Sequence, residues 1–144
     1  MKAHLSVLLI LILASVQGTA LAAAATQVDP SVTSVLAAGY WEHAGKRGTF
    51  RVVMSQGGFE HINTTVVAEW LEESSGSTSS PRVRTSRDLL RNHLASFDMP
   101  SLKVYPNRVR VTLNGVLTQM PDSKVSCVFD LLGDGTVRVV RECS

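Results

Sequence analysis

The sequence has 144 residues, a mass of 15.5 kDa, 44% apolar and 18% charged residues, a formal net charge of +2 and two cysteines. This composition leaves room for one domain and excludes a disordered protein, which would have fewer apolar and more charged residues. The charge is too balanced for a dedicated nucleic-acid binder, and two cysteines are too few for a disulfide-dense scaffold.

Residues 1–22 have the pattern of a secretory signal peptide. Lys2 gives a positive start, an apolar run follows from residue 5 to residue 16, and Ala20 and Ala22 place small residues at the positions that signal peptidase reads. The run is too short to span a bilayer as a helix, which needs about 20 residues. We therefore expect cleavage near Ala22, a mature chain without a transmembrane segment, and a periplasmic or secreted location.

The mature chain is predicted to start with a flexible arm over residues 23–35, followed by a single β-rich domain over residues 36–144. In the first half of this domain, some segments alternate apolar and polar side chains and others are rich in β-branched residues. Both patterns favour strands. Three strands are expected there: 39–43, 49–55 and 60–71.

A flexible serine-rich loop is expected at residues 72–81, because this segment has no large apolar side chain to bury. The next stretch is ambiguous. Large apolar residues recur at helical spacing across residues 86–98, which favours one helix, and a strand is the alternative.

The last third of the chain contains further strand and turn patterns. A strand over residues 108–113 is expected to end at Asn114–Gly115, a strong turn dipeptide, with a return strand at 116–120. Pro121–Asp122 predicts the next turn. A final hairpin is expected from residues 124–132 and 136–143, around a glycine-rich connection.

The two cysteines, Cys127 and Cys143, lie on the apolar face of the two strands of this last hairpin. A loop at residues 134–136 places them directly opposite each other, and a loop at residues 133–135 offsets them by two residues. Either register permits a disulfide, and an even number of cysteines in an exported chain favours one. The bond is expected to fix the C-terminus to the sheet.

The predicted fold class is therefore mainly β: a small antiparallel sheet or sandwich of six or seven strands, with one helix at about 86–98 if that stretch is helical. The alternative is an α+β fold.

Two similar triplets, Trp41-Glu42-His43 and Phe59-Glu60-His61, are the most unusual local feature. Imidazole and carboxylate groups can hold zinc and similar ions, so Glu42, His43, Glu60 and His61 form a candidate metal or partner site. Adjacent residues of a strand point to opposite faces, so each pair offers only one ligand to a given face. The simpler interpretation is a set of solvated residues at strand ends.

Charge is segregated along the chain. Residues 60–73 contain four glutamates and no lysine or arginine, and residues 82–110 contain more basic than acidic residues. A basic stretch of this kind can bind an anionic polymer, a lipid surface or an acidic partner, or can be a solvated face that pairs with the acidic strand. The candidate anion-binding residues are Arg82, Arg84, Arg87, Arg91, Arg108 and Arg110.

The sequence predicts no catalytic residue and no cofactor. Our first hypothesis is a non-enzymatic, exported interaction module that binds an unidentified protein or an anionic envelope polymer, and not nucleic acid. The alternative is a small metal-dependent or hydrolytic enzyme that uses the two Glu-His pairs. A third hypothesis is a structural role, which a homo-oligomer would favour.

Overall fold

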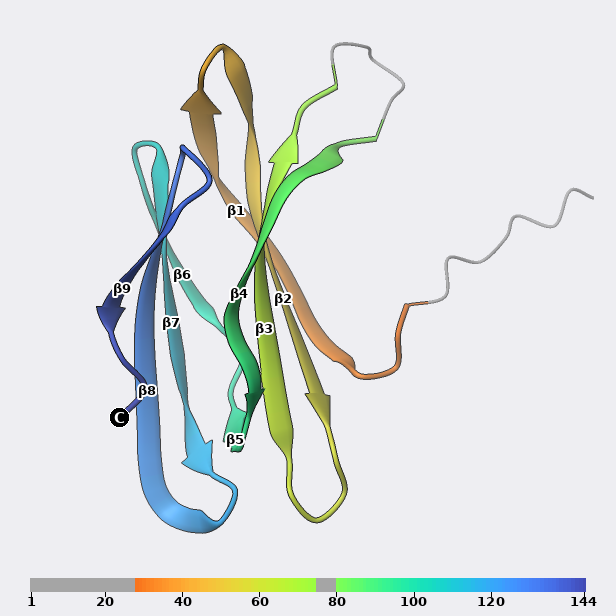
Figure 1. Ribbon diagram of the computed structural model, residues 1–144, viewed down its shortest axis with the longest axis vertical. Helices are drawn as coiled ribbons and strands as arrows, with labels where there is room; N and C mark the ends of the chain where they lie inside the picture. The colour runs from red at the N-terminus through yellow and green to blue at the C-terminus, as the bar shows by residue number, and fades with distance from the viewer. Residues whose placement is uncertain (1–27, 75–79) are drawn as a thin grey trace, which may run out of the picture.

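The computed structural model describes residues 28–74 and 80–144, and within these ranges the chain forms nine strands and no helix. Two antiparallel sheets pack face to face (Figure 1). The prediction of a mainly β fold is confirmed. The described residues contain no helix that is long and apolar enough to cross a membrane. The expected signal peptide at 1–22 lies outside the described residues.

The four-stranded sheet is a meander in which each strand pairs with the next one along the chain. Its strands are β1 (Val32–His43), β2 (Lys46–Gly57), β3 (Asn63–Glu72) and β4 (Arg82–His93). Because β1 begins at Val32, the last four residues of the expected arm belong to the sheet. The expected loop at 72–81 separates β3 from β4, and its residues 75–79 lie outside the described residues.

The five-stranded sheet is built around β7 and β8, its two longest strands. Its strands are β5 (Ala95–Phe97), β6 (Ser101–Tyr105), β7 (Arg108–Leu117), β8 (Met120–Leu132) and β9 (Val137–Arg141). The short strands β5 and β6 pair with different parts of the same edge of β7, and β9 pairs with the far edge of β8.

One hydrophobic core fills the space between the sheets. Both sheets contribute alternate residues to it, as the period-two patterns predicted. Trp70 of β3 reaches across the core, and its Nε1 donates a hydrogen bond to the backbone oxygen of Leu132 on β8 at 2.7 Å. The ring of Phe50 packs edge-on against Trp70, with 5.9 Å between the ring centroids. The outward faces carry most of the charged side chains, and the four-stranded sheet also presents a row of valines there, formed by Val35, Val53 and Val67.

The predicted helix at 86–98 is wrong. Residues up to His93 continue β4, whose backbone pairs with β3, and Ala95–Phe97 form β5. β4 is irregular near its end, where Asn92 adopts a φ of 49° and its backbone amide donates to Thr65 Oγ1 at 3.2 Å. Backbone pairing with the edge of β3 therefore outweighs the helical spacing of the apolar side chains.

The predicted turn at Asn114–Gly115 is also wrong, because β7 passes straight through both residues. A Cβ atom at Gly115 would lie 2.2 Å from the backbone oxygen of Ser96, so the glycine is needed where β5 approaches β7. The chain instead turns at residues 118–119. Pro121 and Asp122 consequently lie in β8, so the turn expected there and the separate return strand at 116–120 do not form.

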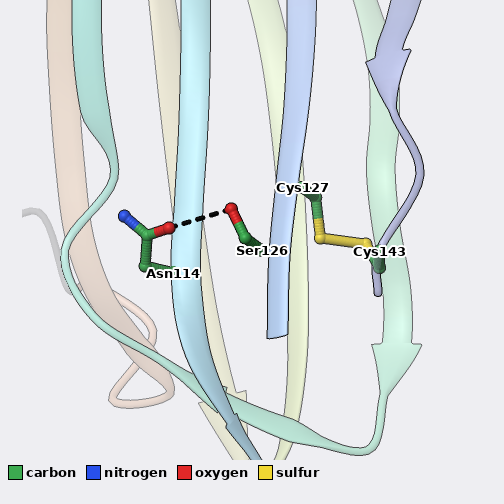
Figure 2. Close-up of a disulfide and its surroundings, with 4 residues drawn as sticks. All are labelled: Asn114, Ser126, Cys127 and Cys143. Atoms are coloured by element: carbon green, nitrogen blue, oxygen red, sulfur yellow. Dashed lines mark hydrogen bonds between the residues drawn. A yellow bond between two sulfur atoms is a disulfide. The ribbon is translucent and has the colours of Figure 1, made fainter. Parts of the chain in front are cut away.

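Cys127 and Cys143 form the predicted disulfide, with their Cα atoms 4.4 Å apart (Figure 2). Cys127 is fully buried in the core, and Cys143 follows β9. Beyond the bond, Ser126 and Ser144 exchange two backbone hydrogen bonds of 3.0 and 3.4 Å. The disulfide therefore holds the C-terminal end of the chain against β8.

The register of this hairpin combines the two predicted alternatives. Close to the turn, Leu131 pairs with Val137, which is the register of the loop at 133–135. A shift between Val128 and Phe129 then changes the register farther along the hairpin. Each extra residue on the side of β9 reduces the expected offset of the two cysteines, so they face each other although the loop is at residues 133–135.

Candidate functional site

The two Glu-His pairs lie at opposite ends of the four-stranded sheet (Figure 1). Glu42 and His43 end β1 at the β1–β2 turn, whereas Glu60 and His61 lie in the loop between β2 and β3, at the other end of the twelve-residue strand β2. All four side chains are exposed. The structure does not bring the two pairs together, and no group of three or more residues suited to hold a metal ion occurs in ranges 28–74 and 80–144.

The four candidate arginines of β4 have partners within their own sheet. Arg84 lies 5.3 Å above the buried ring of Trp41, and Arg82 lies 3.9 Å from Glu72. Arg87 donates to the backbone oxygen of Ser86, and Arg91 pairs with Asp88. These side chains do not converge on a common point.

The acidic strand β3 pairs mainly with β2 rather than with the basic stretch. Glu69 binds Arg51, with 2.6 Å between its Oε2 and the arginine Nε, and Glu72 binds Lys46 at 3.1 Å. Arg82 is the member of the basic stretch that reaches this acidic group. The outer face of the four-stranded sheet is thus largely neutralised by its own ion pairs.

The outer face of the five-stranded sheet is different, because three arginines there surround a single carboxylate. Arg110 and Asp130 are direct cross-strand partners on β7 and β8, and Asp130 is in turn the partner of Arg138 on β9. Arg108 reaches the same carboxylate from one row farther along β7. We call Arg108, Arg110 and Arg138, with Asp130 between them, the arginine cluster.

Asp130 accepts hydrogen bonds from all three guanidinium groups. Arg110 binds both oxygens, with 2.8 Å from Nε to Oδ1 and 3.1 Å from Nη2 to Oδ2. Arg138 Nη2 and Arg108 Nη1 donate to Oδ2 at 2.5 and 3.3 Å. Each guanidinium has five N–H donors, so most donors of the cluster remain free of Asp130. The cluster keeps a net charge of +2 on a partly exposed surface.

The electrostatics of the cluster favour the ionised carboxylate. The hydrogen bonds from Arg110 and Arg138 outweigh the cost of burial and lower the pKa of Asp130 from 3.8 to about 2. The same contact with Asp130 raises the pKa of Arg110 above its ordinary value. Asp130 therefore stays charged and holds the three arginines in fixed positions at neutral pH.

Tyr105 of β6 extends the cluster. The Arg108 guanidinium lies 4.3 Å from the centroid of the Tyr105 ring, and Lys103 Nζ and the Arg110 guanidinium lie 5.4 and 5.9 Å from it. Lys103 is the cross-strand partner of Arg110, so it adds a fourth cation on the same face. Cation–π contact and the buried carboxylate together fix a surface with four cations and one anion.

A shallow hollow of about 450 Å³ adjoins this surface at the end of the sheet. It shares Tyr105 and Arg108 with the cationic surface, and His43, Asn107 and Asp134 also line it. Hydrogen bonds from the Thr136 hydroxyl and backbone amide lower the pKa of Asp134, with a smaller contribution from His43. Polar side chains from β1, the β6–β7 turn and the β8–β9 turn thus meet beside the arginines.

The sequence identified Arg108 and Arg110 as candidates but missed Asp130 and Arg138. The signal was present, because Arg108 and Arg110 share a strand face by parity. Locating Asp130 opposite them requires the β7–β8 turn at 118–119, and the Asn-Gly dipeptide had suggested a turn four residues earlier. His43 reaches the site as a lining residue of the hollow, without Glu60 and His61.

Comparisons of the chain with protein families, with curated proteins and with solved structures give no significant match.

Proposed function

We propose that the protein is an exported, non-enzymatic binding module that holds an anionic polymer or an acidic partner on the outer face of its five-stranded sheet. The observation that carries this proposal is the arginine cluster: three guanidinium groups share one buried carboxylate, the cluster as a whole keeps a net charge of +2, and the guanidinium groups retain free donors. Asp130 aligns these groups before any ligand arrives, which reduces the entropy lost on binding.

Export is supported by two independent features. The disulfide between Cys127 and Cys143 fits an extracellular or periplasmic location, where such bonds persist. The first 22 residues have the charge, length and small-residue pattern of a cleaved leader. When the full chain is expressed in a secreting host, the intact mass of the secreted product should match a chain that begins at or near Ala23. A secreted product that still carries Met1 would contradict cleavage.

The binding proposal is tested by salt elution from immobilised heparin, a sulfated polyanion that serves as a general probe. We expect the wild-type protein to be retained and Arg110→Gln to elute at lower salt, because it loses a cation of the cluster. Arg47→Gln is the matched control, since Arg47 is an exposed, ion-paired cation on the other sheet. Equal elution of all three proteins would refute the proposal.

A further inference from the structure

We infer that the anion held on this face is an acidic polysaccharide whose chain runs across the strands, at right angles to them. This inference rests on the proposed function and specifies its ligand. It is carried by the order of the charged side chains along one row of the sheet and by the polar hollow that adjoins that row.

The row crosses four neighbouring strands. Lys103 of β6 pairs with Arg110 of β7, Arg110 pairs with Asp130 of β8, and Asp130 pairs with Arg138 of β9. Direct cross-strand partners project from the same face, and neighbouring strands lie about 4.8 Å apart, so the row spans about 14 Å. We call Lys103, Arg110 and Arg138, with Asp130 among them, the cationic row.

A linear polyanion with regularly spaced charges is the ligand that matches such a row. Its anions can contact Lys103, Arg110 and Arg138 in succession while Asp130 stays buried beneath them. Carboxylate and sulfate groups both accept the paired N–H donors of a guanidinium. A single small anion would contact only one part of the row, so the affinity for a polyanion should increase with its length.

The hollow beside the row favours sugars over inorganic polyphosphate. Its lining includes His43, Asn107 and Asp134, which are hydrogen-bonding groups of a kind suited to the hydroxyls of a sugar. A polyphosphate chain has no hydroxyl groups along its length to use them. A polysaccharide can place charged substituents on the row and neutral hydroxyls in the hollow.

Single-stranded nucleic acid fits the face less well, because it needs open aromatic platforms for base stacking. Tyr105 is close to the row, but Lys103, Arg108 and Arg110 all lie within 6 Å of its ring centroid. A lipid surface is a competing class in the titration described below, because Val139 and Val140 next to Arg138 are exposed.

Calorimetric titration of the purified mature protein with acidic oligosaccharides of increasing length tests the inference. The probes are size-fractionated oligogalacturonates and heparin oligosaccharides, with polyphosphate, single-stranded DNA and phosphatidylglycerol vesicles as competing classes. We expect affinity for at least one oligosaccharide series to rise with length until the chain spans the row, and then to level off. Polyphosphate, DNA and vesicles should bind more weakly.

The variants Lys103→Gln and Arg138→Gln remove the two ends of the row. Each should lower the affinity for the longest oligosaccharide about tenfold, as expected for one charged contact, and should shorten the length at which affinity levels off. Lys103 has no contact with Asp130, so Lys103→Gln tests the row even if variants of the arginine cluster fold poorly. Arg47→Gln should leave every affinity unchanged.

The outcomes separate the inference from the proposed function. Tighter binding of polyphosphate, DNA or vesicles, or affinity that is independent of oligosaccharide length, would overturn the polysaccharide inference and leave anion binding by the cluster intact. If Lys103→Gln and Arg138→Gln bind oligosaccharides of every length as tightly as the wild-type protein does, the cationic row is not the binding site. If none of the probes binds, both the inference and the proposed function fail.

Discussion

Arg138 is 56% exposed, whereas the Asp130 carboxylate with which it pairs is completely buried. Asp130 lies on the outer face of its sheet, so its burial comes from arginine side chains rather than from the core. A carboxylate covered by its own counter-ions is desolvated and neutralised at the same time. Asp130 therefore contributes to the stability of the fold and also sets the positions of the cationic side chains.

We predict that Asp130→Asn lowers the free energy of unfolding by about 2 kcal/mol, because it leaves three neighbouring cations without a counter-charge. The partly exposed arginines can turn toward water, which keeps the loss below that of a fully buried ion pair. Urea denaturation at pH 7 measures the effect. Asp122→Asn, at an exposed position near the start of β8, is the matched control and should unfold like the wild-type protein.

Stability should also depend on pH through the same carboxyl group. The pKa of Asp130 falls from 3.8 to about 2 in the folded protein, so its stabilising effect is complete well above pH 4 and is lost as pH falls through about 2. The shift corresponds to about 2 kcal/mol. Urea denaturation of wild-type protein and Asp130→Asn between pH 7 and pH 2 should show their difference shrinking toward acid. A difference that stays constant would contradict the assignment.

How far the sequence predicts the structure depends on whether a pattern is local or needs a distant partner. Phe50, Val52 and Met54 alternate along β2 and are all buried, as expected from the two-residue period of a strand. The alternation shows which face of a strand is apolar, and that face packs into the core regardless of which strands are its neighbours. The mainly β class and the disulfide could therefore be predicted.

The errors come from residues whose role is set by another segment. Asn114–Gly115 resembles a turn, but Gly115 is required by the backbone of Ser96, which reaches β7 from another strand. Leu89 and Leu90 are both buried, a pair that fits a helix face, yet they lie where β4 pairs irregularly with β3. The arginine cluster was missed for the same reason: the misplaced turn concealed the pairing of β7 with β8, which brings Arg110 to Asp130, although the final hairpin of β8 and β9 was predicted.

Reduction of the disulfide should destabilise the fold by about 3 kcal/mol, since the bond closes a loop of 16 residues in the unfolded chain. Unfolding in guanidinium chloride with and without a phosphine reductant measures this loss. The double variant Cys127→Ala and Cys143→Ala should already show this loss of stability and should not respond to the reductant.

Hydrogen exchange at the amides of Ser126 and Ser144 should accelerate when the disulfide is removed, because the disulfide supports their backbone pairing. Unchanged exchange there would show that the C-terminal pairing is independent of the bond.

Gly115→Ala should lower the free energy of unfolding by about 2 to 3 kcal/mol, in the upper range for a forced overpacking. The new Cβ would lie 2.2 Å from the Ser96 backbone oxygen and 2.8 Å from the Phe97 Cα atom, so β5 must move away from β7. Gly57→Ala is the matched control at the end of β2, because its Cβ would meet only Asn63 Oδ1, at an ordinary 3.5 Å. Thermal unfolding of both variants measures the contrast, and hydrogen exchange at residues 95–97 reports whether β5 detaches. If Gly115→Ala is as stable as Gly57→Ala, the close approach of β5 to β7 does not determine the choice of glycine.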